Sequence, residues 1–280
     1  MAPAGQTLDA VILGGGINKI PLYPGYTPGY KALLPFAGKP AIQYTMEALC
    51  AVPAVRRILI VGPEAPLRDA LLANGHDLAA CEFVPAGDSP MGSVLKVLPH
   101  VKDNDQVLFT TADLPLVTST SVQTFLRACR CRAGAASLYP TNIYVSAVLG
   151  RSFTGRFARS RKGHMIFREG AVYHGNLVLA DPRAFETPGV VKVMERLYQG
   201  RKNPLRSALA GGWRVALSYG FGAFLLRVVS MEQMARIASK RLGVGIIPVR
   251  VDCPEIAIDV DEPGDYELVK RELEARAVLP

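Results

Sequence analysis

The first half of the chain alternates short apolar runs with segments of helical pattern, and this alternation constrains the fold more than any other feature. The run Leu8–Leu13 ends in three glycines, as buried parallel strands do where they enter a tight loop. Further strands are predicted at Arg57–Val61, Glu82–Pro85 and Gln106–Thr110. Helices are predicted between and after them, at Pro40–Ala51, Glu64–Asn74, Met91–Leu98 and Thr120–Arg130. This series predicts a mostly parallel sheet with helices on both faces.

Two features with chemical potential fall where predicted strands end. The glycines Gly14–Gly16 follow the first strand, and Asp113 follows the strand Gln106–Thr110. In open parallel sheets the ligand crevice lies beyond the carboxyl ends of the strands. We therefore expect both features at one ligand site.

The pattern changes after about Tyr139. Residues 140–245 mix short predicted strands with helices and a basic stretch; these elements are Val145–Leu149, Leu177–Ala180, Val190–Tyr198 and Met231–Lys240. A strand at Ile246–Val251 and a helix at Gly264–Glu274 then match the style of the first half. We interpret residues 1–139 plus 246–280 as the core, and 140–245 as an inserted α+β lobe. We expect this lobe to bind the acceptor, a second ligand besides the one at the glycine loop.

Charge and cysteine content narrow the partners and the compartment. With 32 basic and 24 acidic residues the net charge is +8, which favours an anionic partner. No predicted helix carries a regular basic face with aromatics, so nucleic acid is not expected. The five cysteines lack metal-site spacing, which fits a reducing cytoplasm. No signal peptide is expected, and the late apolar stretch Tyr219–Val229 is too short for a membrane span.

The glycine loop fits a phosphate-binding role without matching the two commonest motifs. Three glycines let backbone amides approach a phosphate chain. The dinucleotide pattern fails because Lys19 stands at the last glycine position, and the Walker pattern fails because Pro40 follows Gly38-Lys39. A tight turn without a ligand is the alternative interpretation. Lys31, which closes the loop, is placed to reach a triphosphate, although a lone lysine is more often solvated.

These residues resemble the nucleotidyltransferases of the molybdenum cofactor guanylyltransferase and sugar-phosphate nucleotidyltransferase type. The family pattern is L-[AG]-[AG]-G-x-G-x-R-[ML] followed by K-x-L-x-P-x-x-G-K-P, and the chain offers Leu13–Ile20 and then Lys31–Pro40. Asn18 replaces a glycine and Ile20 the arginine. Asparagine tolerates left-handed backbone, so the loop is expected to form, with Lys19 as a substitute cation. The resemblance implies that Leu13, Gly14, Gly15, Gly16, Lys19 and Lys31 bind the nucleotide.

The same resemblance implies a magnesium site. The segment Thr111–Leu116 matches the family's [GA]-D-x-P-[LF] element, whose aspartate, here Asp113, binds Mg²⁺. The segment Asp259–Tyr266 matches the element that completes that site, with Asp261 as the better ligand and Asp259 as the second. Carboxylate oxygens suit this ion. The alternative for Asp113 is that it caps a turn. Asp265 is expected to be an acidic residue in the first turn of the helix, where it complements the helix dipole.

Three weaker hypotheses concern the rest of the site. Gly92 and Ser93 begin a predicted helix, where Ser93 either caps the helix or contacts the nucleotide. The stretch Arg151–Arg168 holds six basic residues and no acidic ones, with Arg161 as a candidate acceptor ligand or a solvated surface residue. Asn176 resembles the acceptor-side G-N element of sugar nucleotidyltransferases. A homo-oligomer is left open.

The resemblance covers residues 8–131 and 246–275 and implies a Rossmann-like three-layer α/β/α sandwich. It implies Mg²⁺-dependent transfer of a nucleoside monophosphate from a nucleoside triphosphate (NTP) to a phosphorylated small molecule, with release of pyrophosphate. The alternatives are a glycosyltransferase that uses Asp259-Val260-Asp261 as its metal motif, and an NTP-binding protein that has lost turnover.

Overall fold

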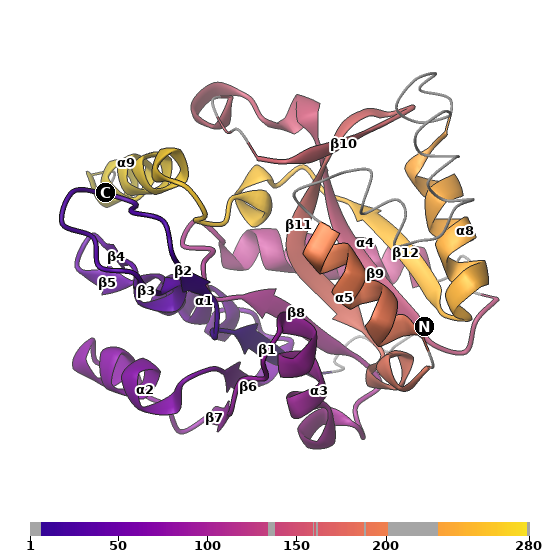
Figure 1. Cartoon of the computed structure of the whole chain (residues 1–280), viewed down its shortest axis with the longest axis horizontal. Coiled ribbons are helices and arrows are strands. Elements are labelled where there is room, and N and C mark those ends of the chain that lie inside the picture. The colour runs from indigo at the N-terminus through magenta and orange to yellow at the C-terminus, as the bar shows by residue number, and fades with distance from the viewer. Residues whose placement is uncertain are drawn as a thin grey trace.

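A single large sheet organises the computed structural model, which describes residues 7–133, 138–158, 160, 162–187, 189–200 and 229–278. Its strands follow the order β12-β9-β11-β8-β1-β6-β7, and β10 pairs with β11 (Figure 1). Their bounds are β1 Leu8–Leu13, β6 Val55–Val61, β7 Cys81–Val84, β8 Val107–Thr111, β9 Asn142–Leu149, β10 His164–Phe167, β11 Gly170–Ala180 and β12 Gly245–Arg250.

The half of the sheet built from the N-terminal residues is parallel. Strand β1 pairs in parallel with β6 and β8, and β6 pairs in parallel with β7. Strand β11 runs antiparallel to β8 and β9, while β12 is parallel to β9. The predicted mostly parallel sheet is therefore confirmed. The carboxyl ends of β1, β6, β7 and β8 meet at one edge, where the glycine loop and Asp113 begin.

Helices cover both faces of the sheet. Successive strand residues point to opposite sides, so the apolar strands present apolar side chains on both faces, and the helices bury them. In β1, Ala10 and Ile12 join one core cluster and Val11 joins the other. The first cluster includes α1 Ala41–Cys50, α2 Glu64–Ala73 and α4 Ser119–Ala133, and the second includes α3 Pro90–Val101 and α5 Val190–Gly200. The three-layer α/β/α fold is confirmed. Helix α8, Met231–Leu242, lies along β12 (Figure 1).

A third core cluster joins the two ends of the chain. The C-terminal helix α9, Pro263–Val278, buries Tyr266, Val269 and Leu273 against Leu34 and Phe36 of the N-terminal region. That region holds short paired strands, β2 Ile17–Asn18 with β3 Gly29–Tyr30 and β4 Pro35–Phe36 with β5 Lys39–Pro40, around the 3-10 turn Lys31–Leu33. Figure 1 shows α9 beside β4 and β5. This packing brings the residues before α9 next to Lys31.

The segment predicted as an insertion contributes strands to the central sheet. Strands β9 and β11 lie between β8 and β12, so they extend the core sheet instead of forming a sheet of their own. A strand's partners depend on long-range pairing that its own sequence pattern does not encode. The boundary between a core and an acceptor lobe stays a prediction. The predicted stretch Tyr219–Val229 falls outside the described residues except for Val229.

The cysteines and the length of the helices can be compared with the sequence where the structure describes the chain. All five cysteines are free thiols, in agreement with the absence of a spacing pattern. Among the described residues, no helix combines the length and the apolar character that a membrane crossing requires. Most predicted helices and strands lie within a few residues of the observed ones, but β11 begins seven residues before the strand predicted at Leu177–Ala180, and β10 was not predicted.

Candidate active site

Three carboxylates meet at the carboxyl edge of the sheet. Asp113 follows β8, and Asp259 and Asp261 precede α9; one oxygen of each lies within 4.8 Å of the others. The backbone holds the two segments together, since the amide of Val260 donates to the carbonyl of Asp113 at 3.2 Å. The side chain of Val260 is buried in the third core cluster, so its two neighbours face the site. The structure thus brings together the three aspartates that the sequence singled out.

Lys31 lies inside this cluster. Its Nζ donates to Asp113 Oδ2 at 3.0 Å and also contacts Asp261 Oδ1, and only 16% of its side chain is exposed. Burial disfavours its charge, but the attraction of Asp113 and Asp261 outweighs burial and raises the pKa of Lys31 above its usual value. Its backbone amide donates to Gly16 O at 2.9 Å, so the glycine loop sets its position.

A second lysine, Lys162, enters the site from the segment between β9 and β10. Its Nζ lies 2.9 Å from Asp259 Oδ1 and 2.7 Å from Asp265 Oδ2. Burial again opposes its charge, and the two carboxylates raise the pKa of Lys162. Lys162 belongs to the basic stretch Arg151–Arg168, in which Arg161 and not Lys162 is the predicted ligand. No local pattern distinguishes it, because its partners come from the other end of the chain.

The carboxylates differ in their electrostatic environment. Burial and the charge of Asp113 raise the pKa of Asp259 to about 6, and Lys162 only partly offsets them. Asp265 acts at the start of α9: its Oδ2 accepts from the amides of Asp261 at 3.1 Å and Glu262 at 3.0 Å. The predicted helix-terminal role of Asp265 is confirmed, with the added contact to Lys162.

The glycine loop packs against the loop that follows β7. The amide of Gly14 continues the sheet ladder by donating to Val61 O at 2.7 Å. A Cβ on Gly15 would lie 3.0 Å from the Cβ of Ala86, so this close approach favours glycine. Leu13 ends β1 and is half-buried, whereas Gly16 and Lys19 are exposed. These residues line the same edge as the carboxylates.

Asn18 corrects one expectation about this loop. It lies in β2 rather than in left-handed backbone, and its side chain is buried. Its Oδ1 accepts from the amide of Ile20 at 2.9 Å, and its Nδ2 donates to the carbonyl of Asp261 at 3.4 Å. Asn18 therefore replaces a glycine by a side chain that ties the loop to the aspartates. Ile20, which takes the place of the family's arginine, is 44% exposed.

The Gly38-Lys39-Pro40 element supports the site from a distance. Gly38 has a φ of 83° in the two-residue turn between β4 and β5, a conformation that favours glycine. Lys39 donates to Glu47 Oε1 at 2.8 Å on α1. This part of the motif shapes the scaffold that follows Lys31.

The residues of the weaker hypotheses are placed as follows. Ser89, and not Ser93, caps α3 by accepting from the amide of Gly92 at 2.9 Å. The hydroxyl of the buried Ser93 accepts from the amide of Gly87 at 3.1 Å. The capping alternative for Ser93 is therefore wrong, because the helix begins four residues earlier than that role requires. Contact of Gly92 and Ser93 with a nucleotide stays a prediction.

The acceptor-side candidates are only partly described. Asn176 lies where the pairing of β11 with β9 is irregular, and its Nδ2 donates to Ile256 O at 3.2 Å. Gly175 beside it admits no side chain, since a Cβ would lie 2.3 Å from Ser146 Oγ. Arg161 lies outside the described residues. A role of either candidate in acceptor binding stays a prediction.

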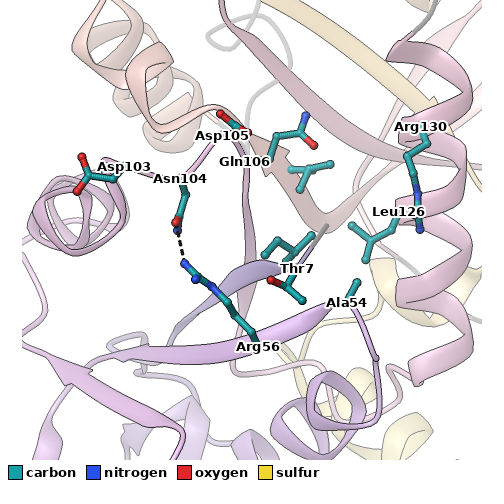
Figure 2. Close-up of a pocket in the computed structure, with 11 residues that line it drawn as sticks. Thr7, Ala54, Arg56, Asp103, Asn104, Asp105, Gln106, Leu126 and Arg130 are labelled. Carbon is teal, nitrogen blue, oxygen red and sulfur yellow. Dashed lines mark hydrogen bonds between the residues drawn. The ribbon is translucent and has the colours of Figure 1, made fainter. Parts of the chain in front are cut away.

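A separate pocket lies at the opposite edge of the sheet (Figure 2). It has a volume of about 280 Å³ and is lined by residues at the starts of β1, β6 and β8, among them Thr7, Ala54, Arg56 and Gln106, and by Arg130 of α4. Figure 2 shows Arg56 donating to Asn104 there. None of the predicted site residues lines this pocket.

Comparison with known protein families identifies the domain that carries these residues. The model of the MobA-like NTP transferase domain matches residues 10–172, which is more than half of the chain. The chain belongs to this family. The match spans the glycine loop, Lys31 and Asp113, and ends before Asp259 and Asp261. The predicted superfamily is confirmed, and with it the class of nucleotidyltransferases.

Individual relatives agree with this family. The chain is 35% identical over 97 residues to the 2-C-methyl-D-erythritol 4-phosphate cytidylyltransferase of Thermobifida fusca (strain YX). That match covers 33% of this chain and only 39% of the relative's length.

Solved structures extend the likeness to nearly the whole chain. A hypothetical transferase from Thermus thermophilus is 26% identical with a TM-score of 0.69, and the match covers 93% of this chain and 99% of that one. A CMP:2-keto-3-deoxy-manno-octonic acid synthetase complexed with CTP shares the fold at 13% identity and a TM-score of 0.56, covering 97% of this chain and 100% of that one.

Proposed function

We propose that this protein is a Mg²⁺-dependent nucleotidyltransferase that transfers a nucleoside monophosphate from an NTP to a phosphorylated small molecule and releases pyrophosphate. The observation that carries the proposal is the placement of Lys31. Its backbone is bonded to the glycine loop and its ammonium contacts Asp113 and Asp261. A triphosphate cradled by the loop would therefore meet both the ammonium of Lys31 and a cluster of candidate metal-binding carboxylates.

The residues divide the work of phosphoryl chemistry between positioning and charge compensation. The acceptor phosphate is already an anion, so the reaction needs no strong general base. Amides of Gly15 and Gly16 would hold the β- and γ-phosphates, while the amide of Gly14 already donates to Val61 O. Lys31 would offset charge on the α-phosphate and on the leaving pyrophosphate. Lys19, which is exposed at the loop, would add a second cation to the triphosphate.

Asp113, Asp259 and Asp261 would hold the magnesium ion. Their oxygens lie within 4.8 Å of one another, and hard carboxylate oxygens are the ligands this ion takes. Bound there, magnesium supplies Lewis-acid polarisation of a phosphoryl oxygen and a template for the two substrates. Lys31 would have to leave the carboxylates for this arrangement, and an incoming triphosphate offers its ammonium a new partner.

The names of the relatives indicate which substrates to test first. The curated relative is a cytidylyltransferase of an erythritol phosphate, and one structural neighbour was solved with CTP. CTP and polyol or sugar phosphates are therefore the first candidates, followed by cofactor phosphates. We assign acceptor contact to Asn176, and base or ribose contact to Gly92 and Ser93, on the family resemblance alone. We assign acceptor contact to Arg161 on the basic character of its stretch.

Two alternative functions differ from the proposed one in what the protein does with its nucleotide. An NTP-binding protein without turnover is favoured by the apolar, exposed Ile20 where the family carries arginine. A glycosyltransferase would use Asp259-Val260-Asp261 with a nucleotide-sugar, which leaves Lys31 without a triphosphate.

The deciding experiment is a pyrophosphate-release screen with four NTPs against polyol, sugar and cofactor phosphates, with and without Mg²⁺. Asp113→Asn is the control, since its loss of charge should abolish release. Metal-dependent release with one pair supports the proposal. NTP binding without release above the control overturns the proposal in favour of the binding protein. A parallel assay offers a nucleotide-sugar in place of the NTP, and its hydrolysis would favour the glycosyltransferase.

A further inference from the structure

The segment between β9 and β10 is fastened to the C-terminal part of the chain at several points. Ser152 Oγ donates to Asp252 Oδ1 at 2.7 Å, and Arg156 Nη1 lies 3.0 Å from Glu272 Oε2 on α9. Lys162 makes the third attachment. Of these contacts, only that of Lys162 reaches the candidate metal ligands.

Lys162 is built into the structure and is not a solvated basic residue. Only 11% of its side chain is exposed, and its ammonium bridges Asp259 and Asp265. Burying a lysine is unfavourable unless its charge is paired and its donors are satisfied. The two carboxylates supply that pairing, so the position of this lysine is specified by the site.

The bridge through Asp265 links Asp259 to the backbone of Asp261. The same atom, Asp265 Oδ2, accepts from Lys162 Nζ and from the amides of Asp261 and Glu262. Lys162 therefore connects the side chain of one candidate metal ligand to the main chain of the next. A network of this kind restricts the rotamers of the ligands it joins.

The two lysines of the site contact different carboxylates. Lys31 contacts Asp113 and Asp261, whereas Lys162 contacts Asp259 and Asp265. A metal ion shared by Asp113 and Asp261 must displace the ammonium of Lys31 from between them. Lys162 holds Asp259 from the side of α9 and can keep its contacts when the metal binds.

We propose that Lys162 is a positioning residue of the metal site: its ammonium holds Asp259 beside Asp113 and Asp261 against their mutual repulsion. Without it, Asp259 would rotate away from the two like charges, and the third ligand would no longer be preset. The inference deepens the proposed function and rests on its assignment of the three aspartates to a metal. It concerns this chain's own residues and can be tested without turnover.

The test measures Mn²⁺ binding to the full chain without nucleotide, from the loss of the electron paramagnetic resonance signal of the free ion. Lys162→Met should raise the dissociation constant about tenfold, as the loss of a group that holds a metal ligand in place does. Lys162→Arg, which keeps the charge, should restore affinity to within about threefold of the wild type.

Two matched variants separate positioning from mere attachment. Arg156→Met breaks another ion pair between the same segment and α9, and Lys270→Met removes an exposed lysine on α9. Both should bind Mn²⁺ as the wild type does. Thermal unfolding of each variant, with and without Mn²⁺, checks the fold and repeats the affinity ranking.

Three outcomes would overturn the inference: no Mn²⁺ binding by the wild type, equal or tighter binding by Lys162→Met, or an equal loss with Arg156→Met. Tighter binding would mean that the ammonium only competes with the metal. The pyrophosphate screen is independent of these results. A wild type that binds Mn²⁺ but releases no pyrophosphate would contradict the proposed function. The role of Lys162 would then still be decided by the Mn²⁺ titration of the variants.

Discussion

The two edges of the central sheet hold carboxylates in opposite circumstances. At the amino edge Asp9 is fully buried and is bonded by Arg56, Arg57 and Asn104 at 2.6 to 3.2 Å. At the carboxyl edge, Asp113, Asp259 and Asp261 crowd together. Each edge places acid groups next to cations, but Asp9 stands apart from other carboxylates among several donors, whereas the three aspartates at the carboxyl edge lie next to one another.

The pKa shifts express this difference. Burial disfavours the charge of Asp9, but hydrogen bonds from Arg57, Asn104 and Arg56 outweigh it and lower the pKa of Asp9 below its ordinary value. At the other edge, burial and the charge of Asp113 raise the pKa of Asp259 to about 6. Asp9 thus stabilises the fold, whereas the crowded aspartates are poised to gain a cation.

The largest expected effect is on activity, at the carboxyl edge. Asp113→Asn should reduce pyrophosphate release by about a thousandfold or more, because it removes one ligand of the charge-compensating cluster. Its midpoint of thermal unfolding should change little, since like-charge crowding is relieved as the contact to Lys31 is weakened. Comparing kcat/KM and the unfolding midpoint for both proteins checks this. A variant that unfolds but keeps its specific activity would contradict the assignment.

The corresponding Asp→Asn substitution at the amino edge should affect stability instead of activity. Asp9→Asn should lower the free energy of unfolding by about 2 kcal/mol, because charge-assisted hydrogen bonds from two arginines are lost. Activity per folded molecule should remain. Urea unfolding followed by circular dichroism measures the change. A loss of activity without a loss of stability would show that the two edges are not separate in function.

The pH dependence of stability sharpens the same comparison. Because the pKa of Asp9 is lowered from its ordinary value of 3.8 by folding, its contribution is present above that value. The contribution is lost as pH falls through the lower pKa of the folded state. The difference in unfolding free energy between wild type and Asp9→Asn should therefore be full at neutral pH and shrink below pH 3.8. A difference that grew on acidification would have the wrong sign.

The smallest expected effect concerns the departure from the family at Ile20. Ile20→Arg places a guanidinium at an exposed position of the glycine loop, where an NTP phosphate would accept a charge-assisted hydrogen bond. The KM for NTP should fall about fivefold, which corresponds to about 1 kcal/mol. Steady-state kinetics at fixed acceptor measures it, with Ile17→Arg, at another exposed apolar position, as the control. Equal gains in both variants would indicate a general charge effect.

The sequence predicted the positions of the candidate site residues best where local patterns place them. The glycine loop, Lys31 and the aspartates lie at the ends of strands or before a helix, and strand ends are readable from apolar runs. Asn18 and Lys162 were interpreted incompletely. The partner of Lys162 lies 103 positions away, and no local pattern specifies such a contact.

The sequence by itself determined the order of helices and strands, because apolar periodicity and turn residues act over a few positions. It also determined the chemical groups available at each strand end. The tertiary structure alone decided that β9 and β11 join the central sheet and that α9 packs on the Lys31 segment. It also decided that Lys162 reaches Asp259. These outcomes depend on burial and pairing between segments that are distant in the sequence. Such contacts stabilise the protein only when the folded chain brings the segments together.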